Sequence, residues 1–217
     1  AKKIPSLNER FNKVKEFRAN SKAAETRPAQ EYPHRFRQIQ SVAKVDTLII
    51  PQVSAETREY LPIGLLPQNS IVSNLAFALY DAPLWNMAMI ASRLHLTWIA
   101  TVCGKMKTDF RYSNTMGWNT FPVPTLTEQN KIDLTVCAEN ILLAREVHFP
   151  ATIADLYDPE KMPENLRLAH DQNDEVLERI FIGRRFKNDT ERLEKLFDLY
   201  TKMIATEKNK SVKRIKA

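Results

Sequence analysis

Residues 83–113 read PLWNMAMIASRLHLTWIATVCGKMKTDFRYS, and this stretch decides the fold. Its first part is largely apolar and of helical length, with Pro83 at a plausible first position and Gly104 just past the end. A membrane span rarely tolerates the polar residues that interrupt this apolar run, which are Asn86, Arg93 and His95. We therefore predict a long central helix that is buried in the core, with His95, Trp85 and Trp98 as core residues.

The segment that follows this helix, KMKTDFRYS, alternates in character. In one extended strand successive side chains point to opposite faces, so Lys107, Asp109 and Arg111 would share a face. Thr108, Phe110 and Tyr112 would then point the other way, into a core. The pattern predicts a strand that presents three charged side chains in a row.

Such a row suits the edges of bases in the major groove of DNA. Guanine offers two acceptors to a Lys or Arg donor, and its partner cytosine offers an N4 donor to a carboxylate. Lys107 and Asp109 would then read a G·C base pair, while Arg111 would take a second purine or a phosphate. The alternative is an ordinary salt-bridged face of a strand.

The rest of the chain divides into three parts, and the expected fold class is α+β. Residues 1–45 are expected to be a basic helical linker, with residues 1–31 as a helix. Residues 46–124 are expected to be a mixed α/β domain with short strands around the central helix. Pro51 and Pro62 lie inside two apolar runs, which indicates edge or bulged strands. Residues 125–217 are expected to be an all-α module whose first helix is capped by Thr127.

The net charge of +6 is unevenly placed along the 217 residues. Residues 1–50 carry 11 Lys/Arg against 5 Asp/Glu, and residues 84–120 carry 4 against 1, whereas residues 121–217 are nearly balanced. Two basic segments indicate a polyanionic partner, although solvated charge without a partner would leave the same pattern.

The motifs of common catalytic sites are missing from the sequence. Its four glycines are too far apart for a cofactor-binding loop, and its four histidines never fall at metal-ligand spacing. No Asn/Asp-Pro-Pro-aromatic tetrad of an amino-methyltransferase occurs. Cys103 and Cys137 are expected to be reduced and buried. We expect no catalysis, no metal and no cofactor in this chain itself.

A specific order of motifs runs from residue 60 to residue 124. It comprises Tyr-x-Pro-Ile-Gly-x-Leu from Tyr60, Ser73-Asn74, Pro83-Leu-Trp, SRLH with Trp98, Cys103-Gly104, RYS from Arg111 and NTFPVP from Asn119. This stretch closely resembles the target recognition domain of MmeI-like (type IIL) restriction–modification enzymes. Those enzymes join an endonuclease, an adenine-N6 methyltransferase and a recognition domain in one polypeptide. Segments on both sides, such as LYDPEKMPENLRLAH from residue 156, resemble the same family.

The resemblance implies that this chain is the DNA-reading part of a larger methyltransferase of the bacterial cytoplasm. The S-adenosylmethionine cofactor would be bound by a methyltransferase domain that precedes residue 1. In that family the charged positions after the Cys-Gly corner read bases, which here are Lys107, Asp109 and Arg111, and the Lys/Asp combination favours a G·C pair. The implied partners are double-stranded DNA and the chain's own methyltransferase domain, with no membrane.

Other polar residues are candidates for secondary DNA contacts. Arg93 and Lys105 flank the three charged residues and are expected to contact phosphates. Ser113, Asn114 and Asn119 could bond to phosphate or base edges, or fix their own loop. Ser73 and Asn74 could touch DNA or form a turn. The basic N-terminal residues could follow the DNA backbone or pack against the methyltransferase domain; they are Lys13, Lys15, Arg18, Lys22 and Arg27. A helical protein–protein interaction module with a basic arm is the alternative from a different class.

Overall fold

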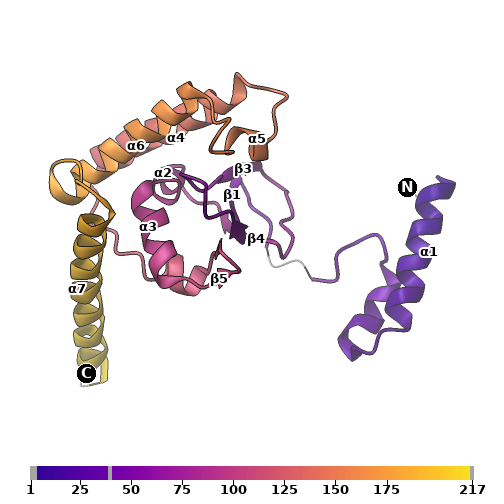
Figure 1. The fold of residues 1–217 in the computed structure, drawn as a ribbon. Helices are drawn as coiled ribbons and strands as arrows, with labels where there is room; N and C mark the ends of the chain where they lie inside the picture. The colour runs from indigo at the N-terminus through magenta and orange to yellow at the C-terminus, as the bar shows by residue number, and fades with distance from the viewer. Residues whose placement is uncertain (1–3, 39–40, 216–217) are drawn as a thin grey trace. The chain divides into compact units, whose positions relative to one another are not determined.

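The computed structural model of the protein describes residues 4–38 and 41–215 and divides into two compact units, residues 1–42 and 43–217 (Figure 1). The first unit holds α1 (Pro5–Ala19) and the 3-10 helix η1 (Ala24–Glu31). The single helix expected over residues 1–31 is therefore wrong, because the chain turns after Ala19. Arg18 joins the two pieces, since its guanidinium donates to the Ala29 carbonyl at 2.8 Å and to the Tyr32 carbonyl at 3.0 Å.

The second unit is built on a three-stranded antiparallel sheet in the order β3-β1-β4. Its strands are β1 (Asp46–Pro51), β3 (Gly64–Pro67) and β4 (Ala76–Tyr80). The edge or bulged strand expected at Pro51 is wrong, because β1 is the central strand. The proline is tolerated as the last residue of β1, paired with Ala76 of β4 beyond the end of β3.

A second, smaller sheet has the order β2-β6-β5. It consists of β2 (Val53–Ser54), β5 (Lys105–Met106) and β6 (Asp109–Arg111). Gln52 connects the two sheets through its backbone. Its N–H donates to the Leu75 carbonyl at 3.2 Å, and its carbonyl accepts from the Tyr112 N–H at 2.8 Å. Through these two bonds, Gln52 ties the residue before β4 to the residue after β6.

The long central helix expected from the sequence is two helices, α2 (Trp85–Ile90) and α3 (Arg93–Val102). The break falls at Ser92, whose hydroxyl accepts from the His95 N–H at 3.1 Å and so caps α3. Serine is a preferred N-cap residue, but the apolar run around it hides that signal. Both helices are buried as expected, with Trp98 only 1% exposed.

The remainder of the second unit is helical, which confirms the α+β fold class. It contains α4 (Glu128–Glu146), α5 (Ile153–Leu156), α6 (Glu164–Ile182) and α7 (Asp189–Ile215). Thr127 caps α4 as expected, in a reciprocal capping box with Asn130. Helices α4 and α6 pack side by side (Figure 1), while α2 packs on α4 and α3 packs on α7. Sheet and helices therefore share one core. Among the described residues, no helix combines the length and apolarity that crossing a membrane requires.

Candidate nucleic-acid interface

The three charged residues singled out in the sequence lie on a β-hairpin made by β5 and β6. Lys105 pairs with Phe110 and Met106 pairs with Asp109, so Lys107 and Thr108 form a two-residue turn. Lys107 has φ +60°, in the left-handed region that such turns use. The single extended strand predicted from the alternation is therefore wrong. No glycine or asparagine marks the turn, which is why the sequence pattern concealed it.

Asp109 and Arg111 do share a face of β6, as the alternation predicted. Directly across the ladder, Met106 lies opposite Asp109 and Val53 lies opposite Arg111. This face is open to solvent, since Arg111 is exposed and Met106 and Val53 are 46% and 36% exposed. Two charged residues, Asp109 and Arg111, therefore lie on this face of β6, and Lys107 lies at the exposed tip of the hairpin. The three charges do not form one row.

We call Lys107, Asp109, Arg111, Met106 and Val53 the hairpin surface. Met106 and Val53 were missed by sequence reasoning. The pairing of β2 with β6 joins segments far apart in the chain, and no local pattern reveals that register. Two apolar side chains thus border the charged ones, one on each neighbouring strand.

The opposite side of the hairpin anchors it to the core. Phe110 packs against the core cluster, and Tyr112 is buried with its hydroxyl 3.0 Å from His95 Nε2. Burial lowers the pKa of His95 to about 3, so this histidine is neutral at physiological pH. The expected core role of His95 is confirmed. A rigid anchor beneath the hairpin fixes where its outer face points.

The charged groups of the hairpin differ in what they contact. The Asp109 carboxylate accepts from the Glu56 backbone N–H at 3.4 Å. Lys105 Nζ lies 3.7 Å from the Glu56 carboxylate and 5.7 Å from the centre of the Phe110 ring. Among the described residues, neither Lys107 nor Arg111 forms an ion pair. Those two cations are therefore available to an external anion or acceptor.

Arg93 does not offer its charge in the same way. Its guanidinium lies 3.0 Å from the Asp189 carboxylate at the start of α7, and this hydrogen bond raises the pKa of Arg93. A phosphate contact by Arg93, as predicted from the sequence, would therefore share its guanidinium with Asp189. The guanidinium already has a carboxylate partner, and the backbone N–H of Arg93 donates to Asp174 at 2.8 Å.

The loop after β6 fixes itself through its own polar side chains. It forms the π-helix η2 (Asn114–Trp118), which Ser113 caps by accepting from the Met116 N–H at 3.2 Å. The Asn114 side-chain oxygen accepts from the Thr115 N–H at 2.9 Å. Asn119 is exposed, and its backbone N–H donates to the Asn114 carbonyl. Ser113 thus has the loop-fixing role, while the Asn114 and Asn119 side chains stay at the surface.

Ser73 and Asn74 lie in the turn that precedes β4. The Ser73 hydroxyl accepts from the Leu75 N–H at 3.4 Å, which gives Ser73 the turn role, and Asn74 is exposed. The carbonyl of Leu75 is bound by Gln52, the same residue that binds Tyr112. This turn therefore lies beside the strand that carries Arg111.

The basic residues of the first unit are partly engaged within it. Arg18 holds α1 to the segment that follows, Arg27 donates to the Ser21 carbonyl at 3.3 Å, and Lys13 pairs with Glu9 at 2.7 Å. Lys15 and Lys22 are exposed.

Within residues 4–38 and 41–215, no three His, Cys, Asp or Glu side chains gather in a way that could hold a metal ion. Cys137 is buried and Cys103 is half-buried, and both are free thiols.

The second unit is thus a two-part α+β module, in which small antiparallel sheets with an exposed charged hairpin pack against helices. Comparison with known families identifies both parts. Residues 1–125 match the target recognition domain of MmeI, and residues 126–207 match the MmeI C-terminal domain. The chain belongs to the MmeI family.

Two relatives extend this result. DNA methyltransferase A of Bacillus subtilis (strain 168) is 37% identical over 202 residues, which cover 93% of this chain and 23% of that protein. A solved structure of the type IIL restriction–modification enzyme MmeI in complex with DNA matches with a TM-score of 0.82 and 32% identity, over 93% of this chain and 27% of that one. The chain thus spans about a quarter of the length of these relatives.

Proposed function

We propose that this chain is the sequence-specific double-stranded DNA recognition module of a restriction–modification adenine-N6 DNA methyltransferase. Methylation, and any cleavage, would be carried out by domains outside the chain, in the bacterial cytoplasm. The observation that carries this proposal is the match of the chain to the MmeI target recognition domain, in which the exposed, charged hairpin lies. The relatives named as a DNA methyltransferase and as an MmeI–DNA complex support it.

The hairpin has the right shape for the major groove, which admits a two-stranded β-ribbon. Lys107 at the tip would donate to O6 and N7 of a guanine, and Asp109 would accept from N4 of the paired cytosine. Arg111, two positions further along the exposed face, would take a second purine or a phosphate. Because Lys107 and Arg111 have no ion-pair partner among the described residues, these contacts require no internal ion pair to break.

Neighbouring polar groups would position the duplex. Lys105 is exposed on the hairpin itself, Asn114 and Asn119 are exposed just after it in sequence, and Asn74 is exposed on the turn beside β6. Contacts from such groups to phosphates fix register and orientation without reading bases. Ser73 and Ser113 would act indirectly, by holding their turns. The bound module would present the target adenine to a methyltransferase domain of the same polypeptide, where the flipped base meets S-adenosylmethionine.

A charge exchange on the hairpin tests the proposal. Lys107→Glu with Asp109→Arg, in the full-length enzyme, should change the preferred base pair at one position and leave the methylation rate on the new sequence largely intact. Each good bidentate contact is worth about 1–3 kcal/mol of discrimination. The measurement is sequencing of methylated sites in a randomised DNA library.

The matched control exchanges an exposed ion pair on α6, with Glu175→Arg and Arg179→Glu, which should leave the preferred sequence unchanged. The hairpin assignment would be wrong if the hairpin exchange abolished methylation of every sequence. It would equally be wrong if the preferred sequence stayed the same.

A further inference from the structure

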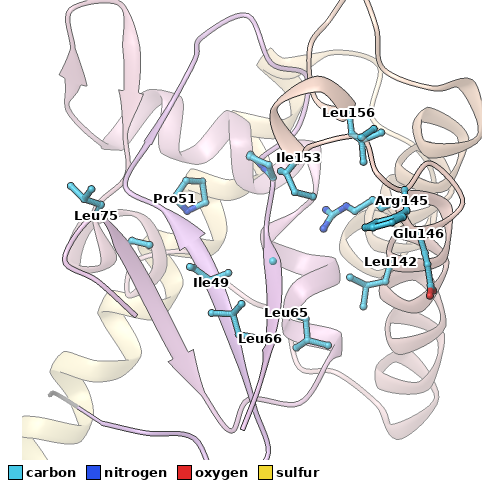
Figure 2. A pocket seen from close by; sticks show the side chains of 15 residues that line it. Ile49, Pro51, Leu65, Leu66, Leu75, Leu142, Arg145, Glu146, Ile153 and Leu156 are labelled. Carbon is cyan, nitrogen blue, oxygen red and sulfur yellow. The ribbon is translucent and has the colours of Figure 1, made fainter. Parts of the chain in front are cut away.

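A groove of about 900 Å³ lies between one face of the β3-β1-β4 sheet and the corner formed by α4 and α5 (Figure 2). Ile49, Pro51 and Leu66 line it from the sheet. The opposite wall is lined by aliphatic side chains of the two helices, namely Leu142 of α4 and Ile153 and Leu156 of α5. Neither the hairpin surface nor the proposed base contacts involve this groove.

The groove face of the sheet carries no charged residue, which is unusual for an open face of a small antiparallel sheet. One face of β1 supplies Leu48 and Ile50 to the core. The strand registers place the residues of the other face, on the groove side, as Thr47, Ile49, Pro51, Gly64, Leu66, Ala76, Ala78 and Tyr80, and none of them is charged. A sheet with one solvated face normally alternates apolar and polar residues. This pattern indicates that the groove face is covered in the working protein.

The rim of the groove is also apolar and open. Leu75 is 73% exposed, Phe149 is 87% exposed and Ile153 is 44% exposed. Exposed apolar side chains that gather around one groove suit a site of interaction. Arg145 and Glu146 are the charged residues among those that line the groove, so they offer no net charge to a nucleic acid.

The two walls of the groove are held together before anything binds. Arg145 of α4 is 7% exposed, and its guanidinium donates both to the Ile63 carbonyl, just before β3, and to the Tyr157 hydroxyl, just after α5. One buried side chain therefore ties the helix, the strand and the α5 corner into a fixed shape. A partner pays little ordering cost in a groove of fixed shape.

We propose that this groove is the docking site for the methyltransferase-bearing part of the same polypeptide, through an apolar segment of that part. The inference rests on the proposed function, which makes this chain one part of a longer enzyme. The matched relatives are about four times as long as this chain, which corresponds to their recognition and C-terminal domains. Their remaining length supplies a covalently linked partner, and a linked partner binds at high effective concentration. Docking there holds the hairpin at a set distance from the flipped base.

Thiol labelling in the full-length polypeptide tests this docking. Leu75→Cys at the rim is compared with Leu168→Cys on α6, a matched control because Leu168 is 51% exposed. We expect a maleimide to label residue 75 about tenfold or more slowly than residue 168, since a covered surface reacts only on opening. Peptide mass spectrometry reads each site separately from Cys103 and Cys137. Equal rates at the two positions would overturn the proposal.

A second variant distinguishes the occupant. Adding Ile153→Lys to Leu75→Cys places a charge in the groove and should restore rapid labelling, whereas adding Leu168→Lys should not. If the protection of residue 75 fades on dilution, a second copy of the chain covers the groove and the proposal is wrong. The labelling needs neither DNA nor S-adenosylmethionine, so it does not depend on which bases the hairpin reads. Protection without sequence-specific methylation would refute the proposed function alone.

Discussion

The carboxylate of Asp189, the first residue of α7, lies 3.0 Å from the guanidinium of Arg93, the first residue of α3. Asp189 also accepts from the Thr97 hydroxyl at 3.3 Å, one turn further along α3. Trp98 packs against α7 as well, with its ring centroid 5.2 Å from that of Phe197. Helix α3 leads directly into the hairpin. Helix α7 therefore holds in place the helix that precedes the hairpin.

Replacing Asp189 with alanine should lower the free energy of unfolding by about 1 kcal/mol, because half-exposed ion pairs are worth little each. The control is Asp198→Ala, which removes an exposed i,i+4 pair with Lys202 in the same helix and should cost clearly less than Asp189→Ala. Urea unfolding measures both. Equal losses for the two variants would mean that Asp189 does not join α7 to α3.

The stability of the protein should depend on pH through Asp174. Burial raises the pKa of this carboxyl from its ordinary 3.8 to about 7, although it accepts from the Arg93 N–H and the Tyr60 hydroxyl. The folded state therefore keeps a proton that the unfolded state releases, and this group's contribution to stability is lost as pH rises from about 4 to about 7.

Asp174→Asn removes that titration while keeping an oxygen acceptor for Arg93. We compare the free energy of unfolding of the variant with that of the parent protein. The difference, variant minus parent, should rise between about pH 4 and about pH 7, because only the parent loses the contribution of Asp174. The pKa values of buried His95 and His170 are lowered to about 3, and their contribution is lost as pH falls below about 6.5. They act alike in both proteins and cancel in the difference. A flat difference curve would show that Asp174 is ionised throughout.

The turn at Lys107 separates backbone strain from side-chain chemistry. The free energy of unfolding should be about 1 kcal/mol higher for Lys107→Gly than for Lys107→Ala, because alanine at φ +60° retains the cost of the left-handed region. Both variants lose the ammonium group. They should therefore lose the same discrimination at the base pair that Lys107 is proposed to read, measured by competitive methylation of two duplexes. A difference in discrimination between them would assign the effect to the turn.

Gly64 is required by close packing and not by its backbone angle. A Cβ placed there would lie 2.6 Å from Ile49 Cγ2 on the neighbouring strand. Gly64→Ala should cost about 1–3 kcal/mol by overpacking. In an Ile49→Ala background the obstructing methyl group is gone, and the same substitution should cost markedly less. Denaturant unfolding of the double-mutant cycle gives the coupling, and additive effects would show that Ile49 is not the obstacle.

The sequence predicted the class of elements well and their junctions poorly. Apolar spacing located the strands at Asp46, the buried helical region and the capped helix at Thr127 because burial and capping leave local patterns. The break at Ser92 and the turn at Lys107 left no such pattern, since each falls inside a segment whose average character continues through it. The ion pair of Arg93 was missed because its partner, Asp189, lies 96 positions away, and ion pairs at that separation leave no trace in spacing.

Of the side chains at residues 105–112, Phe110 and Tyr112 are the two that pack against the core cluster. Residues 105–109 and 111 are exposed or half-buried. Mutations at the outward positions therefore disturb no packed layer and meet little resistance from folding. Under the proposed function, a lineage can drift from one recognition sequence to another by a few substitutions in a domain whose stability stays constant. The same partition makes the hairpin a natural cassette for laboratory diversification.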